Sequence, residues 1–375
     1  MNELPKIGLI YLTYPTKNWQ EDISRFLTSL QKISYPKERI ELICVESRGD
    51  RPPIKPWFFE NWMPKSANEL PKISYIFSDE RLGFATNNNL GYEKALELGC
   101  DYIELTNEDT DIDPDYLKYA VERAEKDNKI GIVQSLLLLG QDRDLVNSIG
   151  NSLHYLGFGY SRGYRWIKEH ALNLLDRERM TNPELTIGYA SGAAMLIRVQ
   201  ALKEVGFLFD EKFYSYHEDT DVSLQLKIRG WKIVLEPKSI VYHYYEFAKQ
   251  KINYYWMERN RYVIIFSYYS DWMILILSPM IILMDFGILF FSILRGWSFM
   301  KLKVYADWFN WDYWDWITSR RKAIKTARKL SEQEFFQDTV SEIDFQEESV
   351  KNPLLKYIGN PLLGAYWFLV SKLIL

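Results

Sequence analysis

The sequence predicts an α/β domain over residues 1–250, followed by a mainly helical region over residues 251–375. In the first part, short apolar runs alternate with segments whose apolar residues recur at helical spacing. In the second part, the run from Trp272 to Leu294 has 23 residues and only one charge, Asp285. A chain of 375 residues is long enough for two such parts, because a domain commonly takes about 150 residues.

The first part is expected to begin with a strand at residues 6–13 and a helix that ends near residue 33. Further strands are expected at 40–46, 73–77, 102–106 and 130–139, with helices at 88–98 and after Pro114. Strands joined by helices of this length form a mostly parallel sheet with both faces covered. Ligands of such sheets bind at the carboxyl ends of the strands. The sequence is polar at these ends: Thr13-Tyr14-Pro15, Glu46-Ser47-Arg48, Ser78-Asp79-Glu80 and Asn107-Glu108-Asp109.

Composition excludes some classes of function. The formal net charge is -4, so no global positive field is available to bind nucleic acid. The two cysteines, Cys44 and Cys100, provide neither a disulfide framework nor a zinc ligand set, and we interpret them as packing residues. The N-terminal residues lack the basic and apolar regions of a secretory signal, which predicts a cytoplasmic protein.

Acidic residues are crowded between Phe213 and Tyr244. His217, Glu218, Asp219 and Asp221 lie within five residues, and His243 follows a short apolar strand. Neighbouring acids raise one another's pKa unless a cation or a ligand shares the charge, which indicates a general base or a cation site. The alternative is that these acids are ordinary first-turn residues of a helix, where the helix dipole favours them.

Several segments occur in an order typical of one enzyme family. They are the opening strand, the second strand ending at Glu46, RLGFATNNNLGYEKAL (81–96), LTNEDTDIDPDYL (105–117), the block from Ala190 to Trp231, and EPKSIVYH (236–243). With these segments the chain resembles the inverting nucleotide-sugar glycosyltransferases of family 2, and most of all their rhamnosyltransferase-like branch, over about two thirds of its length. The resemblance implies a GT-A fold, which is a Rossmann-like domain that binds nucleotide-diphosphate sugars, and inverting transfer of a hexosyl or deoxyhexosyl group.

The resemblance also implies roles for individual acids. Asp219 would be the general base, and Glu218 would orient or bind the acceptor. Asn107-Glu108-Asp109 lies where relatives carry a D-x-D motif that presents oxygen ligands to Mg²⁺ or Mn²⁺. Asp109 would be the metal ligand, with Asp111 and His243 as further ligands, although Asn107 lacks the charge of the first acid of the motif. The alternatives are a plain turn at 109–115 and a buried His243 bonded to backbone. Asp221 would cap its helix or pair with a cation such as Arg229.

Donor and acceptor contacts follow from the same resemblance. Glu46 would accept hydrogen bonds from a uracil- or thymine-type base. The donor set is completed by Thr13, Tyr14, Gly83, Asn88, Asn107, Glu108 and Asp109, with Asn87 and Asn89 beside Asn88 at a helix start suited to phosphate. Ser191-Gly192-Ala193 would let the acceptor or sugar approach the backbone closely. Asparagine runs are also common in loops, and a tight strand entry would explain the small residues equally well.

The apolar run from 272 to 294 indicates a membrane. Basic residues flank it on both sides, so a single span is disfavoured. Pro279 and Gly287 instead suggest a helical hairpin that dips into one leaflet or lies on it, and the tryptophans and basic residues from 300 to 330 suit an anionic surface. The alternative is a soluble helical extension that packs on the first domain or forms a homodimer.

The sequence therefore predicts a peripheral or monotopic glycosyltransferase of polysaccharide biosynthesis in the cell envelope, at the cytoplasmic face of the cell membrane. Its donor would be a UDP- or dTDP-type nucleotide sugar, its cofactor Mg²⁺ or Mn²⁺, and its acceptor a hydroxyl of a lipid-linked or growing glycan. Two alternatives remain. One is transfer to a polyprenyl monophosphate, and the other is a non-catalytic membrane scaffold that binds a nucleotide sugar or a glycan.

Overall fold

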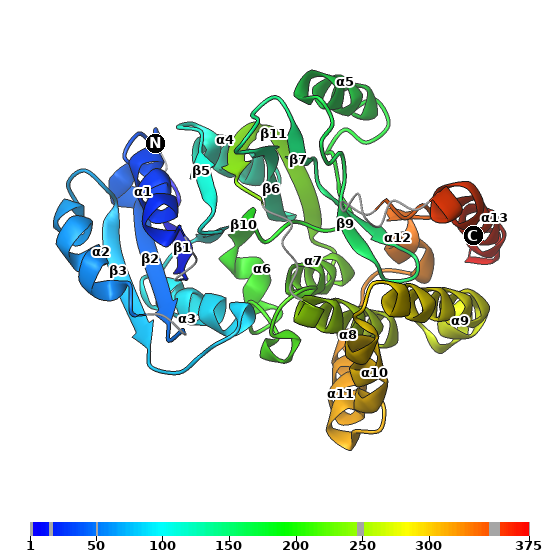
Figure 1. The fold of residues 1–375 in the computed structure, drawn as a ribbon. Helices are drawn as coiled ribbons and strands as arrows, with labels where there is room; N and C mark the ends of the chain where they lie inside the picture. The colour runs from blue at the N-terminus through cyan, green and yellow to red at the C-terminus, as the bar shows by residue number, and fades with distance from the viewer. Residues whose placement is uncertain (1–2, 15–17, 50–51, 246–250, 345–352, 375) are drawn as a thin grey trace. The chain divides into compact units, whose positions relative to one another are not determined.

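The structure is a computed structural model that describes residues 3–14, 18–49, 52–245, 251–344 and 353–374. The chain forms two compact units (Figure 1). The first comprises residues 1–151, 161–214 and 231–246, and the second comprises 152–160, 215–230 and 247–375. The predicted domain boundary at residue 250 stays a proposal. The two units do not follow a single boundary in the sequence: residues 152–160 and 215–230 belong to the same unit as the C-terminal helices.

The first unit is built on a nine-stranded sheet in the order β3-β2-β1-β4-β10-β6-β11-β5, with β7 paired to β6. The strands are β1 Ile7–Thr13, β2 Ile40–Ser47, β3 Lys72–Ser78, β4 Tyr102–Thr106, β5 Thr110–Ile112, β6 Ile130–Leu139, β7 Val146–Ser148, β10 Ala194–Arg198 and β11 Lys232–His243. Its helices are α1 Trp19–Leu30, α2 Lys55–Asn61, α3 Phe84–Glu97, α4 Tyr116–Glu125, α5 Lys168–Glu178 and α6 Val199–Lys203, with 3-10 turns at Lys37–Arg39, Met63–Lys65 and Glu211–Phe213.

The predicted strand and helix alternation is confirmed, but the sheet is mixed rather than mostly parallel. Strands β3, β2, β1 and β4 are parallel, whereas β10 runs antiparallel to both of its neighbours, β4 and β6. Every residue of β1, β2, β4 and β6 is buried, as expected for continuous apolar strands covered on both faces. Helix α1 buries Ile23, Phe26, Leu27 and Leu30 at the predicted spacing.

Helix α3 begins at Phe84, four residues before the predicted start at Asn88. The difference has a local cause. The side-chain amides of Asn87 and Asn88 donate to the carbonyls four residues earlier, Gly83 O at 3.1 Å and Phe84 O at 3.0 Å. These asparagines therefore lie inside the first turns of the helix rather than in the loop before it.

The second unit is mainly helical. Its helices are α7 Glu218–Ile228, α8 Lys251–Tyr268, α9 Asp271–Leu294, α10 Ser298–Asp307, α11 Trp311–Ala327, α12 Glu332–Phe336 and α13 Asn360–Ile374, with a π-helical turn at Leu355–Gly359. A three-stranded sheet joins β12 (Thr339–Val340), β8 (Asn151–His154) and β9 (Gly159–Ser161). Strands β8 and β9 lie at the points where the chain passes between the two units.

The predicted helical hairpin at 272–294 is wrong, because α9 is one continuous helix with Pro279 inside it. Proline has no N–H, so the carbonyl four residues earlier loses its helical donor. That carbonyl belongs to Leu275, and the hydroxyl of Ser278 donates to it at 2.8 Å. The neighbouring serine thus replaces the lost hydrogen bond, and the helix continues through the proline.

Candidate active site

The first unit brings several predicted residues to the carboxyl ends of its parallel strands. Thr13 on β1 pairs with Glu46 on β2, and Tyr11 pairs with Thr106, the last residue of β4 before Asn107. The hydroxyl of Thr13 donates to Val45 O at 3.2 Å, whereas Tyr14 is exposed. These residues lie at the carboxyl-end edge of the sheet, the edge at which α/β sheets commonly bind ligands.

Glu46 is 1% exposed, and protein groups occupy both of its carboxylate oxygens. The N–H of Ile54 donates to Oε1 at 2.5 Å, while the N–H of Lys55 and the hydroxyl of Tyr75 donate to Oε2 at 3.0 and 2.6 Å. Glu46 thus anchors the start of α2. Its predicted contact with a base stays a prediction, and that contact would require an oxygen to be shared with these donors. Tyr75, which no sequence pattern singled out, belongs to this group.

The asparagines of α3 are bonded to the protein itself. Asn87 Nδ2 lies 3.1 Å from Ser47 Oγ, and Asn89 exchanges hydrogen bonds with both backbone groups of Phe209. Gly83 is packed so closely that an added Cβ would lie 2.7 Å from the Tyr214 ring. The side chain of Asn88 bonds within its helix, and its predicted contact with a phosphate of the donor stays a prediction.

Asp109 and His243 form the charged centre of this edge. His243 Nε2 lies 3.1 Å from Asp109 Oδ1, and the N–H of Tyr244 donates to Asp109 O at 2.7 Å. Burial opposes ionisation of Asp109, but the charge and hydrogen bond of His243 outweigh it, so the pKa of Asp109 is lowered. Burial, together with the negative charge of Asp109, raises the pKa of Glu108 to about 7. The two neighbouring acids therefore differ in protonation near neutral pH.

Asn147 fixes the orientation of the imidazole. His243 Nδ1 lies 3.1 Å from Asn147 Oδ1, an oxygen that can only accept, so Nδ1 carries the proton. Nε2 then faces the Asp109 carboxylate. It can donate to Asp109 Oδ1 when the ring carries a second proton, and it presents a lone pair when the ring does not. Without that proton two acceptor atoms would face each other at 3.1 Å, and a metal cation between them would remove their repulsion.

Asp111 does not join this pair. Its Oδ2 accepts from Arg143 Nη2 at 2.9 Å and from the Tyr244 hydroxyl at 3.0 Å. Within the described residues, no group of three or more His, Cys, Asp and Glu side chains is arranged to hold a metal ion. Asp109 and His243 lie against each other, whereas Asp111 is paired with Arg143, and the metal roles of all three stay predictions.

The predicted small-residue loop lies next to the Asn107 motif. Strand β10 runs antiparallel to β4, so Ala194 pairs with Thr106, and the N–H of Asn107 donates to Ala193 O at 3.3 Å. The N–H of Ser191 donates to the buried Gln134 Oε1 at 2.8 Å. Ser191, Gly192 and Ala193 are thus positioned by the sheet at the same edge as Asp109.

Glu218 and Asp219 start helix α7 in the second unit. Asp219 Oδ1 accepts from the N–H of Thr220 at 2.6 Å. Burial, and then the charge of Asp219, raises the pKa of Glu218 to about 8. Glu218 Oε2 is buried, and none of the described residues forms a hydrogen bond with it. The turn before α7 contains Tyr214, Tyr216 and His217 at φ values of 63°, 66° and 68°. Non-glycine residues rarely adopt this conformation, and such strain clusters at functional sites.

The partner of Asp221 was not found from the sequence. Arg320 on α11 pairs with Asp221 Oδ1, and the hydroxyl of Tyr268 on α8 donates to the same oxygen at 2.6 Å. Arg229, the predicted partner, donates to Gln225 O and Oε1 at 2.8 and 2.7 Å. Asp221 and Arg320 are 99 positions apart, a separation that no local pattern reveals.

Comparison with known proteins places these features in a family. Residues 10–263 match the family described as "Glycosyltransferase like family 2". The chain is 23% identical over 256 residues to the N-acetylglucosaminyl-diphospho-decaprenol L-rhamnosyltransferase of Mycobacterium tuberculosis, covering 64% of this chain and 76% of that protein.

Two solved structures share the fold. The mannosyltransferase PcManGT from Pyrobaculum calidifontis, in complex with GDP-Man and Mn²⁺, is 14% identical with a TM-score of 0.50, covering 87% of this chain and 86% of that one. S. aureus TarS 1-349 in complex with UDP is 16% identical with a TM-score of 0.51, covering 96% and 89%. The chain therefore belongs to glycosyltransferase family 2, with a GT-A fold, and it is an inverting, rhamnosyltransferase-like enzyme that transfers a sugar.

Proposed function

We propose that the protein transfers a sugar from a UDP- or dTDP-type donor to a hydroxyl of a lipid-linked or growing glycan, at the cytoplasmic face of the membrane. The observation that carries this proposal is the acid pair at the start of α7. Glu218, with a pKa of about 8, holds its proton at neutral pH and can donate a hydrogen bond to an acceptor. Asp219 accepts hydrogen bonds from Thr220 and is the base in the proposal.

Asp109 and His243 are suited to a metal that is shared with the donor. Mg²⁺ commonly binds one or two protein ligands and completes its shell with substrate phosphates and water. A carboxylate and an imidazole 3.1 Å apart fit such a partial set. A bound Mg²⁺ or Mn²⁺ would neutralise charge on the leaving diphosphate. Mn²⁺ is present in the complex of the related mannosyltransferase.

The outer surface of α9 supports attachment to a membrane. Eight large apolar residues of α9 are more than half exposed: Trp272, Leu275, Ile282, Leu283, Phe286, Phe290, Ile293 and Leu294. At about 100° per residue they fall within an arc of about 120° on the helix. Met273, Leu277 and Met280 lie on the opposite, buried side. An apolar face of this size, without a protein partner in the described chain, fits a hydrocarbon environment.

Asp285 favours a helix that lies along the membrane surface over one that crosses it. Asp285 Oδ1 accepts from Lys301 Nζ at 2.6 Å, and its Oδ2 accepts from Tyr305 at 2.6 Å. The chain reverses at Gly296, so α10 folds back beside α9. A spanning α9 would take the charged helix α10 into the hydrocarbon with it, which is costly. If α9 lies parallel to the membrane surface, Asp285 and Lys301 stay on the side of the helix that faces the protein.

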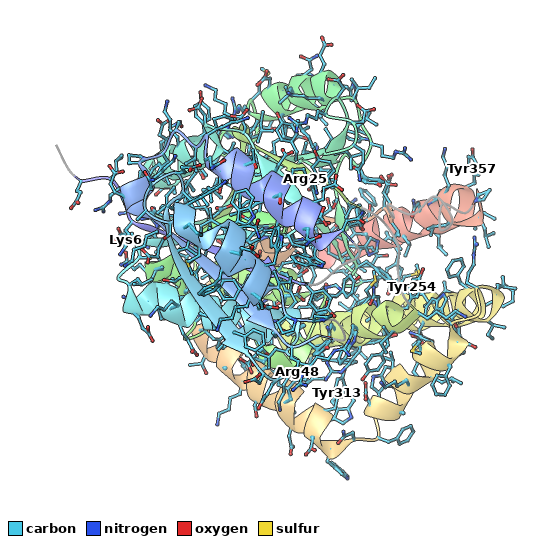
Figure 2. All side chains as sticks on the ribbon, turned by 60° about the vertical axis from the view of Figure 1, so that its left-hand side comes forward. Lys6, Arg25, Arg48, Tyr254, Tyr313 and Tyr357 are labelled. Atoms are coloured by element: carbon cyan, nitrogen blue, oxygen red, sulfur yellow. The ribbon has the colours of Figure 1, made fainter. Side chains whose placement is uncertain are left out.

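Two further segments of the second unit extend the apolar surface. Phe309, between α10 and α11, and Trp311, the first residue of α11, are 88% and 83% exposed. On α13, Phe368, Leu369 and Leu373 are exposed, while Leu363 and Val370 are buried. The hydroxyl of Tyr366 on α13 donates to Ile276 O, so α13 lies beside α9. Figure 2 shows Tyr357, in the turn before α13, pointing away from the ribbon.

The base is tested with Asp219→Asn in the purified full-length protein. With a panel of UDP- and dTDP-sugars and a polyprenyl-diphosphate-linked acceptor, we expect transfer to fall by about 10³-fold or more while donor binding is retained. Transfer that continues to a polyprenyl monophosphate in this variant would instead support the alternative acceptor, whose phosphate needs no strong base. If no donor is turned over by the wild-type protein, the scaffold interpretation gains support.

A further inference from the structure

The C-terminal helices of the second unit hold the first turn of α7 by more than apolar packing. Asp221 lies two residues after Asp219 and is 1% exposed. Arg320 and Tyr268 both bond its Oδ1, and the Tyr268 hydroxyl is also 3.1 Å from the backbone carbonyl of Asp221. Both the side chain and the backbone of this turn are therefore fixed by residues from α8 and α11.

The strained turn before α7 is held by α8. Asn260 on α8 is fully buried, and its Nδ2 donates to Ser215 O at 3.0 Å and to Tyr216 O at 2.7 Å. Tyr216 and His217 have positive φ, a conformation that persists only where the surroundings enforce it. The paired hydrogen bonds from one buried amide supply such a constraint.

The C-terminal end of α7 is also tied to this region. The N–H of Lys329, two residues after the end of α11, donates to Ile228 O at 2.7 Å. Lys227 Nζ donates to Asp338 Oδ2 at 2.8 Å. The helix that carries Glu218 and Asp219 is thus fixed before its start, in its first turn and at its end.

We propose that Tyr268, Arg320 and Asn260 are positioning residues of the sugar-transfer reaction, which set the location and orientation of Glu218 and Asp219. The C-terminal helices would then serve catalysis directly as well as membrane attachment. This inference rests on the proposed role of Asp219. Hydrogen bonds with charged groups are directional, and a displacement of about 1 Å in a reacting group can lower a rate about 100-fold.

Truncated variants would lose these contacts with α7 and the turn before it. Deleting the chain after Lys251 removes Asn260, Tyr268 and Arg320 together, and with them both these hydrogen bonds and any membrane contact. A truncated protein could therefore lose activity for either reason. Single substitutions in the full-length chain are needed to separate the two effects.

The test uses Tyr268→Phe, which keeps the ring beside Phe335 and removes only the hydroxyl. The matched control is Tyr313→Phe, since Tyr313 is also buried in this unit and its hydroxyl faces Arg259 O at 3.4 Å (Figure 2 labels Tyr313). For Tyr268→Phe we expect kcat to fall about 10- to 100-fold with an unchanged donor KM, and amide hydrogen exchange in residues 215–222 to accelerate about tenfold. The control should match the wild type in both readouts.

Arg320→Met leaves Asp221 buried without its cation and can fail to fold. The double variant Arg320→Met with Asp221→Leu removes both charges and should regain the wild-type melting temperature, while kcat stays at least tenfold low. A wild-type kcat in this double variant, or wild-type kcat and exchange in Tyr268→Phe, would overturn the proposal. Hydrogen exchange can be measured without turnover. An inactive wild-type protein would therefore refute the proposed function, while the exchange in Tyr268→Phe would still show whether the C-terminal helices hold the start of α7.

Discussion

Phe286 and Phe290 on α9 provide the sharpest test of membrane attachment. They are 66% and 64% exposed and lie one helical turn apart on the apolar face. Fully burying a phenylalanine stabilises by about 1.5–3 kcal/mol, so burying the exposed two thirds in lipid contributes about 1–2 kcal/mol for each residue. Replacing both with serine should therefore weaken binding by about 2–4 kcal/mol, or roughly 30- to 700-fold in the partition coefficient.

The assay is flotation of the full-length protein with vesicles that contain anionic lipid. The matched control is Ile167→Ser with Met180→Ser, two apolar residues of the first unit that are 63% and 85% exposed. We expect the α9 variant to stay with the soluble fraction and the control to float like the wild type. Flotation of the α9 variant at wild-type levels would refute the membrane contact. A wild-type dimer in solution that the α9 variant converts to monomer would identify a second copy of the chain as the partner of this face.

Three further predictions concern buried polar groups. Lys301 is fully buried and donates hydrogen bonds to Glu258 at 2.7 Å and to Asp285 at 2.6 Å. Lys301→Met leaves these carboxylates without this cation, so it should destabilise the fold by about 3–5 kcal/mol in thermal melting. Adding Asp285→Leu should restore much of the lost stability. Asn147→Leu removes the acceptor for His243 Nδ1 and should weaken Mn²⁺ binding about 10- to 100-fold by calorimetry. Asn147→Asp keeps an acceptor and should bind Mn²⁺ more tightly than the leucine variant. Equal affinities in the two variants would contradict the role of Asn147 in orienting the His243 ring. Burial raises the pKa of Glu104 well above its usual value, so the folded state binds the Glu104 proton more tightly than the unfolded state does. The free energy of unfolding therefore falls as the pH rises above the unfolded pKa of about 4.3. Glu104→Gln should therefore raise the melting temperature more at pH 8 than at pH 4, and an equal change at both would contradict the assigned burial cost.

Patterns of short range predicted much of the first unit. The strands that begin at Ile7, Ile40, Lys72 and Tyr102 follow from apolar runs, and the polar residues at their ends gather at one edge because parallel strands end together. The antiparallel strand β10 was not foreseen. Its five residues lie next to β4 in space although nearly ninety residues separate the two strands, and hydropathy does not report strand direction.

Side-chain partners were the least predictable feature. The Arg320–Asp221 pair and the bonds of Tyr75 to Glu46 link distant parts of the chain, so no local spacing indicates them. Pro279 was interpreted as a break in α9, because the rule for proline considers the lost N–H and not the hydroxyl of Ser278 that replaces it. The ligand role of Asp111 was inferred from the resemblance, which carried no information about its ion pair with Arg143.

We propose that a nucleotide sugar and a divalent metal bind together at the edge formed by Glu46, Asp109 and His243. The most direct measurement is thermal stabilisation of the purified protein by a panel of nucleoside diphosphates and nucleotide sugars, with and without Mn²⁺. We expect a UDP- or dTDP-type ligand at about 100 times its Kd to add about 2.7 kcal/mol of stability, with a smaller gain when Mn²⁺ is absent or Asp109 is replaced by asparagine. Folded protein that no nucleotide stabilises would contradict the proposed donor site.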